Sequence, residues 1–352
     1  MAGLSGTEQR VRILVSDTGR GLWRDAELLA GIIRDHGLTP EMIRCPPRSE
    51  RVVRWVYRFD RIRSALPQVM QSWFNRVHAW LFRTYPDPTV LCTIHLQRIH
   101  TRFVAGPHEN WLFPNPEWYQ PVRIPYLAMM DRVLCKTHDA EKSFRPLSDN
   151  VTYTGFSGLL PEPGGGGRKD FRRFLHVAGN NRKKGTDSVV RAWNNHPEWP
   201  TLDLVIEDRA RLPFVPENVR VHERISDETL DELRDECGIA VAPSEAEGFG
   251  HVLLDAMACG QIVVTVDAPP MNELVDRDRG FLVGWSRSRP CRLGTQYYVD
   301  QQELEAAISE ALAEGQTSLE MRSGAARDWV ISNDQAFRDR MHALLEELIH
   351  GC

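Results

Sequence analysis

The stretch EGFGHVLLDAMACG, residues 247–260, decides the fold of this chain. It follows an apolar run, GIAVAP at 238–243, whose length and β-branched residues predict a buried strand. Apolar residues then recur at helical spacing in the stretch itself: Val252, Leu253, Ala256 and Met257. A strand therefore leads into a helix through residues 244–250, which is the repeating unit of an α/β fold.

This strand-to-helix turn has the features of a binding site for an anion. The backbone N–H groups of a first helical turn, with the positive end of the helix dipole, attract phosphate groups. Gly248 and Gly250 let a phosphate approach the backbone closely. Glu247 lies before the helix and Asp255 more than one turn inside it, so the two carboxylates can reach hydroxyls at opposite ends of a ligand. A diphosphate that joins a sugar to a nucleoside fits this arrangement, with the sugar at one carboxylate and the ribose at the other.

The stretch resembles the glutamate, seven residues, glutamate signature of retaining glycosyltransferases of the family 4 type. The resemblance covers most of residues 170–315 and includes these further segments: NVRVHERISDETLDELRDECGIAVAPS (218–244), QIVVT (261–265), Asn272–Glu273 and RGFLV (279–283). This length favours the family over an isolated glycine-rich turn, which is common in α/β proteins. One departure is Asp255, which stands in place of the second glutamate and is one methylene shorter.

The resemblance implies an α/β fold of the GT-B type, in which two doubly wound Rossmann-like domains face a central cleft. It implies retaining transfer of a hexose from a nucleoside-diphosphate sugar, with no metal or other cofactor. Glu247 is then catalytic, and these residues bind the donor: Asp255, Gly248, Phe249, Gly250, His251 and Val252. Since no nucleophile is evident, stabilisation of the leaving diphosphate is the main catalytic contribution. Asp276 and Asp278 are expected to form a surface turn rather than a metal site.

A basic loop in HVAGNNRKKGTDSVVRAW, residues 176–193, supplies a second part of the donor site. The preceding strand is expected to end at Gly179, which we also assign to donor binding. Lys184 matches the lysine of the family pattern, and its flexible ammonium group can neutralise a leaving diphosphate. The arginine of that pattern is replaced by Asn180, and Arg182 offers a charge two residues further on. The alternative is a loop whose basic side chains are merely solvated.

The composition is that of a globular enzyme with two domains. The 352 residues are 42% hydrophobic and 26% charged, and this length suits two domains of ordinary size. No apolar run approaches the roughly 20 residues of a membrane span, and the first residues lack the apolar core of a secretory signal. The seven cysteines are odd in number and scattered, which favours reduced thiols. We therefore expect a cytoplasmic protein, with peripheral contact at the inner membrane face as a further option.

Alternating strand and helix patterns divide the chain into two α/β domains. Strands are expected at RILVSD (12–17), TVLCTIHL (89–96), NWLF (110–113) and RVLCKT (132–137), and later at RFLHVA, LDLVI, VRVH, IAVA and IVVT. We expect an N-terminal domain on the acceptor side at 1–157, a Pro/Gly-rich linker at 158–170 and the nucleotide-sugar domain at 171–330. Residues 331–352 form a final helix, which in similar proteins packs back towards the N-terminal domain.

The first domain offers candidates for the acceptor side. Gly19 and Gly21 lie in a loop between a strand and a helix, where similar proteins let ligands approach the backbone. Asn115 and Glu117 stand between prolines at an expected strand end, where side chains of an open α/β sheet face the crevice. His95 ends another strand and is a candidate catalytic residue, although a lone histidine in such a place is often structural.

Arginine is concentrated in residues 43–104, which hold 11 arginines and 3 acidic residues. This segment carries a net charge of +8 and, because the chain totals −5, the remainder carries −13. Aromatic residues interleave with the arginines between Arg44 and Arg102, which suits an interface with anionic lipid or a groove that follows phosphates and stacks on bases. The plainer interpretation is an ordinary surface whose aromatic residues pack inside the domain.

Three functions are compatible with the sequence. The favoured one is a glycosyltransferase whose acceptor is a glycan or a lipid-linked intermediate. The second keeps the enzyme but takes a nucleic acid as acceptor, through a hydroxyl on a modified base. The third is a non-catalytic protein that binds nucleotide sugars, which the departures from the family pattern at Asp255 and Asn180 favour.

Overall fold

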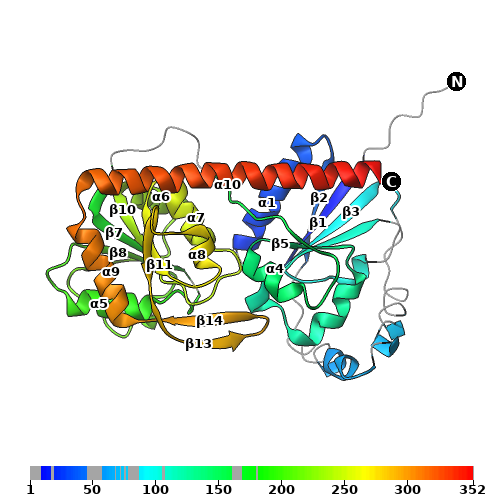
Figure 1. Ribbon diagram of the computed structural model, residues 1–352, viewed down its shortest axis with the longest axis horizontal. Helices are drawn as coiled ribbons and strands as arrows, with labels where there is room; N and C mark the ends of the chain where they lie inside the picture. Colours follow the sequence, from blue (N-terminus) through cyan, green and yellow to red (C-terminus); the bar gives the residue numbers. More distant parts are fainter. Residues whose placement is uncertain are drawn as a thin grey trace. The chain divides into compact units, whose positions relative to one another are not determined.

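The structure is a computed structural model that describes residues 9–16, 20–45, 58–67, 69–71, 73–74, 77, 87–104, 108–160, 169–179 and 181–351. The chain divides into two compact units, each with one six-stranded parallel sheet (Figure 1). Unit 1 comprises Met1–Phe156, Cys291–Gly294 and Gln335–Cys352, and unit 2 comprises Ser157–Pro290 and Thr295–Asp334. The predicted α/β class with two doubly wound sheets is confirmed.

Several predicted features lie outside the described residues. They are Gly19, Asn180, residues 161–168 of the expected linker, and residues 46–57, 68, 72, 75–76 and 78–86 of the arginine-rich segment. None of the helices in the described ranges combines the length and the apolar character that crossing a bilayer requires.

The sheet of unit 1 has the strand order β2-β1-β3-β4-β5-β6. Its strands are β1 (Arg10–Ser16), β2 (Thr39–Cys45), β3 (Val90–Leu96), β4 (Glu109–Phe113), β5 (Arg132–Cys135) and β6 (Val151–Tyr153). Its helical elements are α1 (Arg20–Asp35), α4 (His138–Phe144) and the 3₁₀ segments η1 (Thr101–Phe103), η2 (Pro116–Trp118) and η3 (Pro121–Met129). β3 is buried along its whole length, as expected of a parallel strand covered on both faces.

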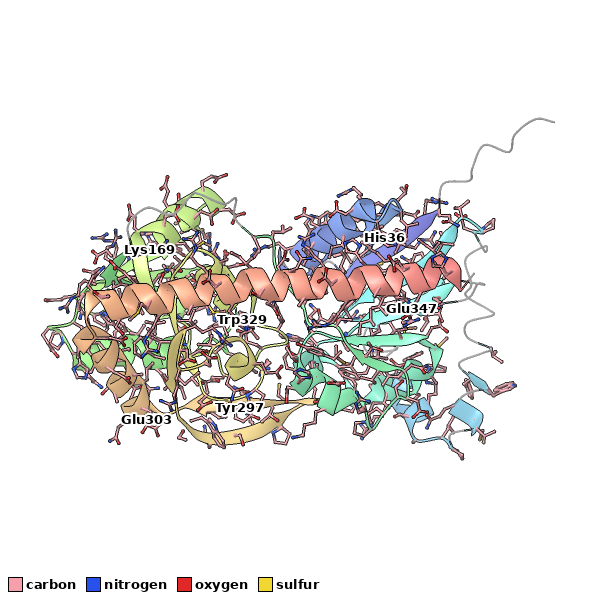
Figure 2. The ribbon with its side chains drawn as sticks, turned by 45° about the horizontal axis from the view of Figure 1, so that its top comes forward. His36, Lys169, Tyr297, Glu303, Trp329 and Glu347 are labelled. Atoms are coloured by element: carbon pink, nitrogen blue, oxygen red, sulfur yellow. The ribbon has the colours of Figure 1, made fainter. Side chains whose placement is uncertain are left out.

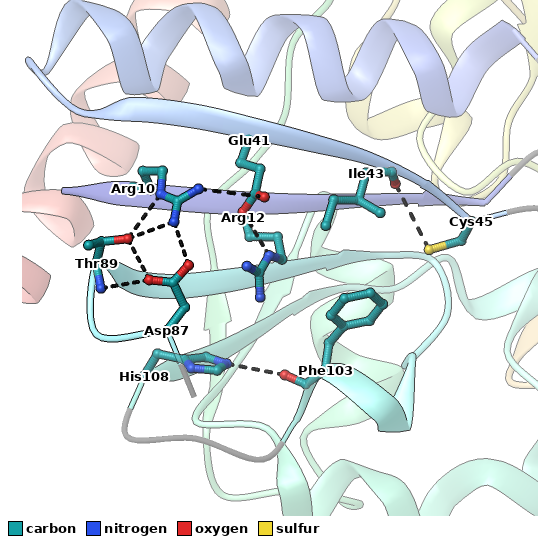
Figure 3. Close-up of polar contacts among 9 residues, drawn as sticks. All are labelled: Arg10, Arg12, Glu41, Ile43, Cys45, Asp87, Thr89, Phe103 and His108. Carbon is teal, nitrogen blue, oxygen red and sulfur yellow. Dashed lines mark hydrogen bonds and ion pairs between the residues drawn. The ribbon is translucent and has the colours of Figure 1, made fainter. Parts of the chain in front are cut away.

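Hydrogen bonds and ion pairs of charged side chains connect residues near the amino ends of β1, β2 and β3 (Figure 3). Arg12 in β1 donates to Glu41 in β2 at 2.9 Å. Arg10 donates to the Thr89 hydroxyl at 2.7 Å and also contacts Asp87. Because Thr89 immediately precedes β3, the first residue of β1 is held against the strand beside it. β1 therefore begins at Arg10, two residues before the apolar run that predicted it.

The sheet of unit 2 has the strand order β12-β11-β10-β7-β8-β9. Its strands are β7 (Asp170–Gly179), β8 (Leu202–Ile206), β9 (Val219–Glu223), β10 (Cys237–Val241), β11 (Ile262–Val266) and β12 (Gly280–Val283). The helical elements are α5 (Thr186–Asn195), η4 (Arg209–Arg211), α6 (Asp227–Glu236), α7 (His251–Ala258), α8 (Met271–Leu274) and α9 (Gln301–Ala313). A two-stranded sheet of β13 (Trp285–Cys291) and β14 (Gly294–Val299), which the sequence did not predict, follows β12.

One long helix, α10 (Gln316–His350), contributes to both units, and the division falls between Asp334 and Gln335. The predicted final helix is thus the last part of a helix that begins much earlier. Five apolar residues of this last part are buried; they are Phe337, Met341, Leu344, Leu345 and Leu348. Within unit 1, Glu347, labelled in Figure 2, forms an ion pair with Arg132 at 2.8 Å.

Two loops of unit 2 pass so closely that one position has to be glycine. Gly185, the residue before α5, has φ +70°, and a Cβ atom there would lie 2.4 Å from the carbonyl oxygen of Pro243. In the same pair of loops, the backbone N–H of Glu245 donates to the carbonyl oxygen of Lys183 at 2.8 Å. These loops follow β7 and β10, neighbouring strands at which the strand order reverses. They therefore lie at the topological switch point, where ligands bind in open α/β sheets.

Gly185→Ala is expected to lower the free energy of unfolding of unit 2 by about 3 kcal/mol, because the new Cβ meets backbone atoms and the residue must keep a left-handed conformation. Gly324→Ala is the matched control, because Gly324 lies in α10 with open space around an added Cβ. This control should leave stability unchanged or raise it. Urea unfolding measures both effects, and equal stability of the two variants would show that the loops separate without cost.

Candidate active site

The structure brings two predicted catalytic residues together at the switch point of unit 2. Lys184 lies in the loop after β7, and Glu247 lies in the loop after β10. Lys184 Nζ donates to Glu247 Oε1 at 2.5 Å, and the two side chains are 16% and 11% exposed. Because both keep some contact with solvent, a ligand can reach them. The pair places one positive and one negative group at the carboxyl edge of the sheet.

The start of α7 forms the next part of the site. Gly250 precedes the helix with φ +113°, a conformation that other residues rarely adopt. The N–H groups of a first helical turn have no hydrogen-bond partner within the helix. The N–H groups of His251 and Val252 therefore point out of the N-terminal end of α7, where the helix dipole is positive. Phe249 is buried, with its ring 5.3 Å from that of His251. Together with Gly248, which is also buried, these predicted donor-binding residues gather at one helix end.

Gly179 and Arg182 lie at the same edge of the sheet. Gly179 ends β7, as predicted, with φ +54°, and Arg182 is exposed in the turn that follows. A further cation, Arg211 of η4, donates to the Gly179 carbonyl oxygen at 3.4 Å. Arg211 was not predicted, because it lies in an irregular connection with no periodic signal. Arg182 and Arg211 thus bring positive charge to this edge of the sheet from two loops, which follow β7 and β8.

Asp255 occupies a different environment from Glu247. It lies on α7, is 8% exposed, and its Oδ2 accepts a hydrogen bond from Arg234 Nη2 at 3.1 Å. Arg234 comes from α6 and also contacts Asp231 at 3.0 Å. The Asp255 carboxylate is therefore compensated inside unit 2, and a ribose hydroxyl would have to share it with Arg234.

A buried histidine that was not predicted, His176, forms hydrogen bonds to residues beside both loops of the site. His176 in β7 is 1% exposed; its Nδ1 lies 2.6 Å from the Val241 carbonyl oxygen and its Nε2 lies 2.9 Å from the Thr186 hydroxyl. Burial lowers the pKa of His176 to about 4, so the ring is neutral at pH 7. Since a carbonyl oxygen only accepts, Nδ1 carries the proton and Nε2 accepts from the hydroxyl. His176 thereby joins β7, β10 and the first residue of α5. The available signal was a polar residue inside the apolar run RFLHVA.

His95, the predicted catalytic residue of unit 1, is engaged within that unit. It is fully buried in β3, its Nδ1 accepts from the backbone N–H of His100 at 3.1 Å, and its Nε2 lies 3.4 Å from Asn110 Oδ1. Burial lowers the pKa of His95 to about 4, so this ring is neutral as well. A catalytic role would require one of these contacts to break.

The remaining candidates of unit 1 lie in two places. Gly21 belongs to the first turn of α1 rather than to a loop, and it is exposed. Asn115 immediately precedes η2, and its carbonyl oxygen accepts two backbone hydrogen bonds. Glu117 is 5% exposed, and Arg292 donates to its carbonyl oxygen at 3.1 Å. Backbone hydrogen bonds thus fix the turn from Asn115 to Glu117.

Asp276 and Asp278 form the turn that was expected. Asp276 Oδ1 accepts from the backbone N–H of Asp278 at 3.0 Å, and Asp276 also pairs with Arg279. Among the described residues, no group of three or more His, Cys, Asp or Glu side chains is close enough to hold a metal ion. We therefore assign these two acids to the turn.

Comparisons with known proteins identify the class. Residues 166–327 match the family described as glycosyl transferases group 1. A glycosyltransferase from Rickettsia africae ESF-5 has a TM-score of 0.67 at 13% identity, with 97% of this chain and 99% of that chain covered. The sucrose-phosphate synthase of Thermosynechococcus elongatus has a TM-score of 0.66 at 15% identity, covering 98% and 100%. An Anabaena protein in complex with UDP and glucose has a TM-score of 0.63 at 13% identity, covering 96% and 99%.

No curated protein matches the sequence significantly. The fold is nevertheless that of the GT-B glycosyltransferases, and both Lys184 and Glu247 fall inside the matched domain. Residues 166–327 thus form a glycosyl transferase group 1 domain of the family 4 type, as the sequence predicted, and this domain uses a nucleotide-sugar donor.

The buried histidine of unit 2 predicts a pH dependence of stability. Since the pKa of His176 is about 4 in the folded chain against its usual 6.5, the unfolded chain takes up the proton first as pH falls. The His176 contribution is complete above pH 6.5 and is lost between pH 6.5 and 4, by about 1.4 kcal/mol per pH unit. His176→Gln cannot be protonated, so its unfolding free energy, measured in urea at several pH values, should fall less steeply than that of the wild type. Identical slopes would contradict a neutral, buried His176.

Proposed function

We propose that the protein is a retaining hexosyltransferase that moves a hexose from a nucleoside-diphosphate sugar to a hydroxyl of a glycan or lipid-linked acceptor, without a metal. The observation that carries this proposal is the contact between Lys184 and Glu247 in the loops beside α7. UDP is the first nucleotide to test, because the Anabaena protein and a pneumococcal O-GlcNAc transferase were both solved with UDP and a sugar.

Each part of the site takes one portion of the donor in this proposal. Lys184, with Arg182 nearby, meets the diphosphate, and the N–H groups at the start of α7 add further donors. Glu247 accepts hydrogen bonds from hydroxyls of the transferred sugar, and Asp255 accepts from the ribose beside Arg234. Because Lys184 and Glu247 pair with each other at 2.5 Å, the donor replaces one charge-assisted contact by two. The exchange therefore leaves neither charge without a partner.

Transfer breaks the bond between the anomeric carbon and the diphosphate oxygen, and it forms a bond from that carbon to the acceptor oxygen. The acceptor hydroxyl attacks on the face from which the diphosphate leaves, so the anomeric configuration is retained. Its proton passes to the departing phosphate oxygen. Negative charge grows on the diphosphate during this step, and Lys184 lies where it stabilises that charge.

A helix in the arginine-rich segment favours an acceptor at a membrane. Residues 58–64 are helical, and two of their charged side chains point inward, since Asp60 and Arg63 are each 1% exposed. The apolar side chains point outward, with Phe59 44% and Ile62 67% exposed. Water favours the opposite arrangement, because apolar surface is stabilised by burial. The outward face therefore suits an apolar surrounding such as a bilayer interface.

A buried network fixes the orientation of this helix. The Tyr126 hydroxyl donates to Asp60 Oδ1 at 2.7 Å, and the guanidinium group of Arg63 lies 3.5 Å from the centroid of the Tyr126 ring. Arg58 and Arg61 remain on the exposed side. More apolar residues are exposed just beyond the helix; they are Val69, Met70 and Trp73. Exposed basic and aromatic side chains in one place are typical of contact with anionic lipid.

Lys184→Ala is expected to reduce turnover by about 30- to 1,000-fold, equivalent to roughly 2–4 kcal/mol of transition-state stabilisation. Stability should change little, because the ion pair that is lost is partly exposed. Release of UDP from a panel of UDP-sugars measures turnover, and thermal unfolding measures stability. Lys183→Ala removes the same charge from the same loop, and it should cost much less activity. Wild-type turnover of the Lys184 variant would contradict the assignment.

Two further outcomes of this assay bear on the proposal. Activity should survive EDTA, and a loss that Mn²⁺ or Mg²⁺ restores would overturn metal independence while leaving the donor site in place. A wild-type protein that binds UDP-sugars but never releases UDP, with or without acceptors, would instead support the non-catalytic alternative.

Arg58→Gln combined with Arg61→Gln is expected to weaken binding to phosphatidylglycerol vesicles, with about 1 kcal/mol lost per arginine. The difference in vesicle binding between wild type and variant should become smaller as salt is raised. Turnover of the variant with a soluble acceptor should persist, because the donor site lies in unit 2. Arg34→Gln combined with Arg145→Gln is the control, since both arginines are exposed in unit 1 and lie at the ends of other helices, α1 and α4. Vesicle co-sedimentation measures binding.

Equal vesicle binding by both double variants would contradict the membrane proposal. If the wild type binds oligonucleotides instead, and only Arg58→Gln with Arg61→Gln reduces the salt dependence of that binding, the nucleic-acid acceptor becomes the favoured one.

A further inference from the structure

The β13–β14 sheet carries an exposed surface that the donor site does not use. Every residue of β13 from Trp285 to Pro290 is exposed, and Trp285 itself is 43% exposed. Arg287 and Arg289 alternate along the strand, so their side chains leave the same face. The ring of Trp285, at the start of the strand, packs against that of Tyr297, with 5.3 Å between the centroids. We call the face of the two arginines, together with Tyr298 of β14, the ribbon face.

Tyr298 orients the two guanidinium groups of the ribbon face. Arg287 Cζ lies 4.3 Å and Arg289 Cζ 5.4 Å from the centroid of its ring. Arg289 also donates to Gln296 Oε1 through Nε at 3.1 Å and Nη2 at 2.9 Å. Among the residues that the structure describes, neither arginine forms an ion pair with a carboxylate. Two positive groups are therefore held in place beside an aromatic ring, and the Glu245 carboxylate is near enough for both to interact with its charge.

Glu245 joins the ribbon face to both loops of the donor site. Its side chain accepts from Gln296 Nε2 at 2.6 Å, and its carbonyl oxygen accepts from the backbone N–H of Tyr297, labelled in Figure 2, at 2.7 Å. Its own N–H donates to the Lys183 carbonyl oxygen at 2.8 Å. Because Glu245 is two residues from Glu247, chain geometry keeps the Tyr297 N–H within about 10 Å of the Glu247 backbone. A ligand on the ribbon face is thus close to the transferred sugar.

We propose that the ribbon face binds the phosphate group of a phosphorylated sugar residue in the glycan or lipid-linked acceptor, for which free sugar phosphates serve as probes. Arg287 and Arg289 contact the phosphate, and Trp285 offers its exposed ring to the sugar. Guanidinium groups bind phosphate through pairs of N–H donors, and stacking on Tyr298 orients them before the ligand arrives. The donor diphosphate is held elsewhere, at Lys184 and the start of α7, so the phosphate at this face belongs to the acceptor. The inference rests on the proposed function.

The test is the affinity of the full chain for glucose 6-phosphate and for glucose, measured by titration calorimetry with the donor site saturated by UDP. The same pair of measurements is made with mannose and with N-acetylglucosamine and their 6-phosphates. At least one phosphorylated sugar is expected to bind about tenfold more tightly than its uncharged counterpart. Arg287→Gln, and Arg287→Gln with Arg289→Gln, should abolish that preference while UDP affinity is unchanged.

Arg172→Gln is the matched control, because Arg172 is exposed near the amino end of β7, at the other edge of the sheet. It should keep the preference for phosphate. The proposal is overturned if no phosphorylated sugar is preferred by the wild type, or if both ribbon variants retain the preference. It is also overturned if the variants lose only binding to phosphatidylglycerol vesicles, which would make the face a lipid contact. A wild-type chain that does not bind UDP would overturn the proposed function itself.

Discussion

The candidate active site depends on how closely two backbone loops approach each other in unit 2. A side chain at residue 185 would meet the Pro243 carbonyl oxygen at 2.4 Å, and the backbones of Lys183 and Glu245 are joined by a hydrogen bond. These loops leave neighbouring parallel strands, so their positions follow from the sheet and from one glycine rather than from the charged side chains. Lys184 and Glu247 meet because the backbone brings them together, and a ligand can separate them without disturbing the fold.

The sequence predicted those parts of the fold whose residues are buried on both faces. β10 and β11 are fully buried apolar runs, and such runs are visible without any tertiary information. β2, with the sequence TPEMIRC, is mostly half-buried, and the β13 sequence WSRSRPC is exposed. Neither has an apolar pattern, so their pairing depends on neighbours that only the folded chain supplies. Lys184 and Glu247 were predicted for another reason, since each matches a residue of the family pattern that the sequence resembles.

Polar residues inside strands and helices have partners that lie far away in the sequence, so the sequence alone does not show what they do. His176 is separated from Val241 by 65 residues, and only their contact shows that the ring is a neutral link between strands. The arginines of the basic segment looked alike in the sequence. The structure separates them: Arg63 is buried against Tyr126, whereas Arg58 is exposed beside Phe59. The net charge of a segment therefore does not show which of its charges a partner can reach.

The two carboxylates of the family signature differ in how easily they can change partners. Glu247 pairs with Lys184 between two loops, and a donor that offers hydroxyls to one and a diphosphate to the other replaces the contact that each loses. Asp255 and Arg234 are buried to nearly the same degree, but Arg234 also pairs with Asp231 of its own helix. Separating Asp255 from Arg234 would therefore leave a buried carboxylate without compensation. The shorter side chain at position 255 thus suits a carboxylate that keeps its arginine and accepts a ligand hydroxyl as an additional partner, whereas Glu247 is the carboxylate whose contacts change when the donor binds.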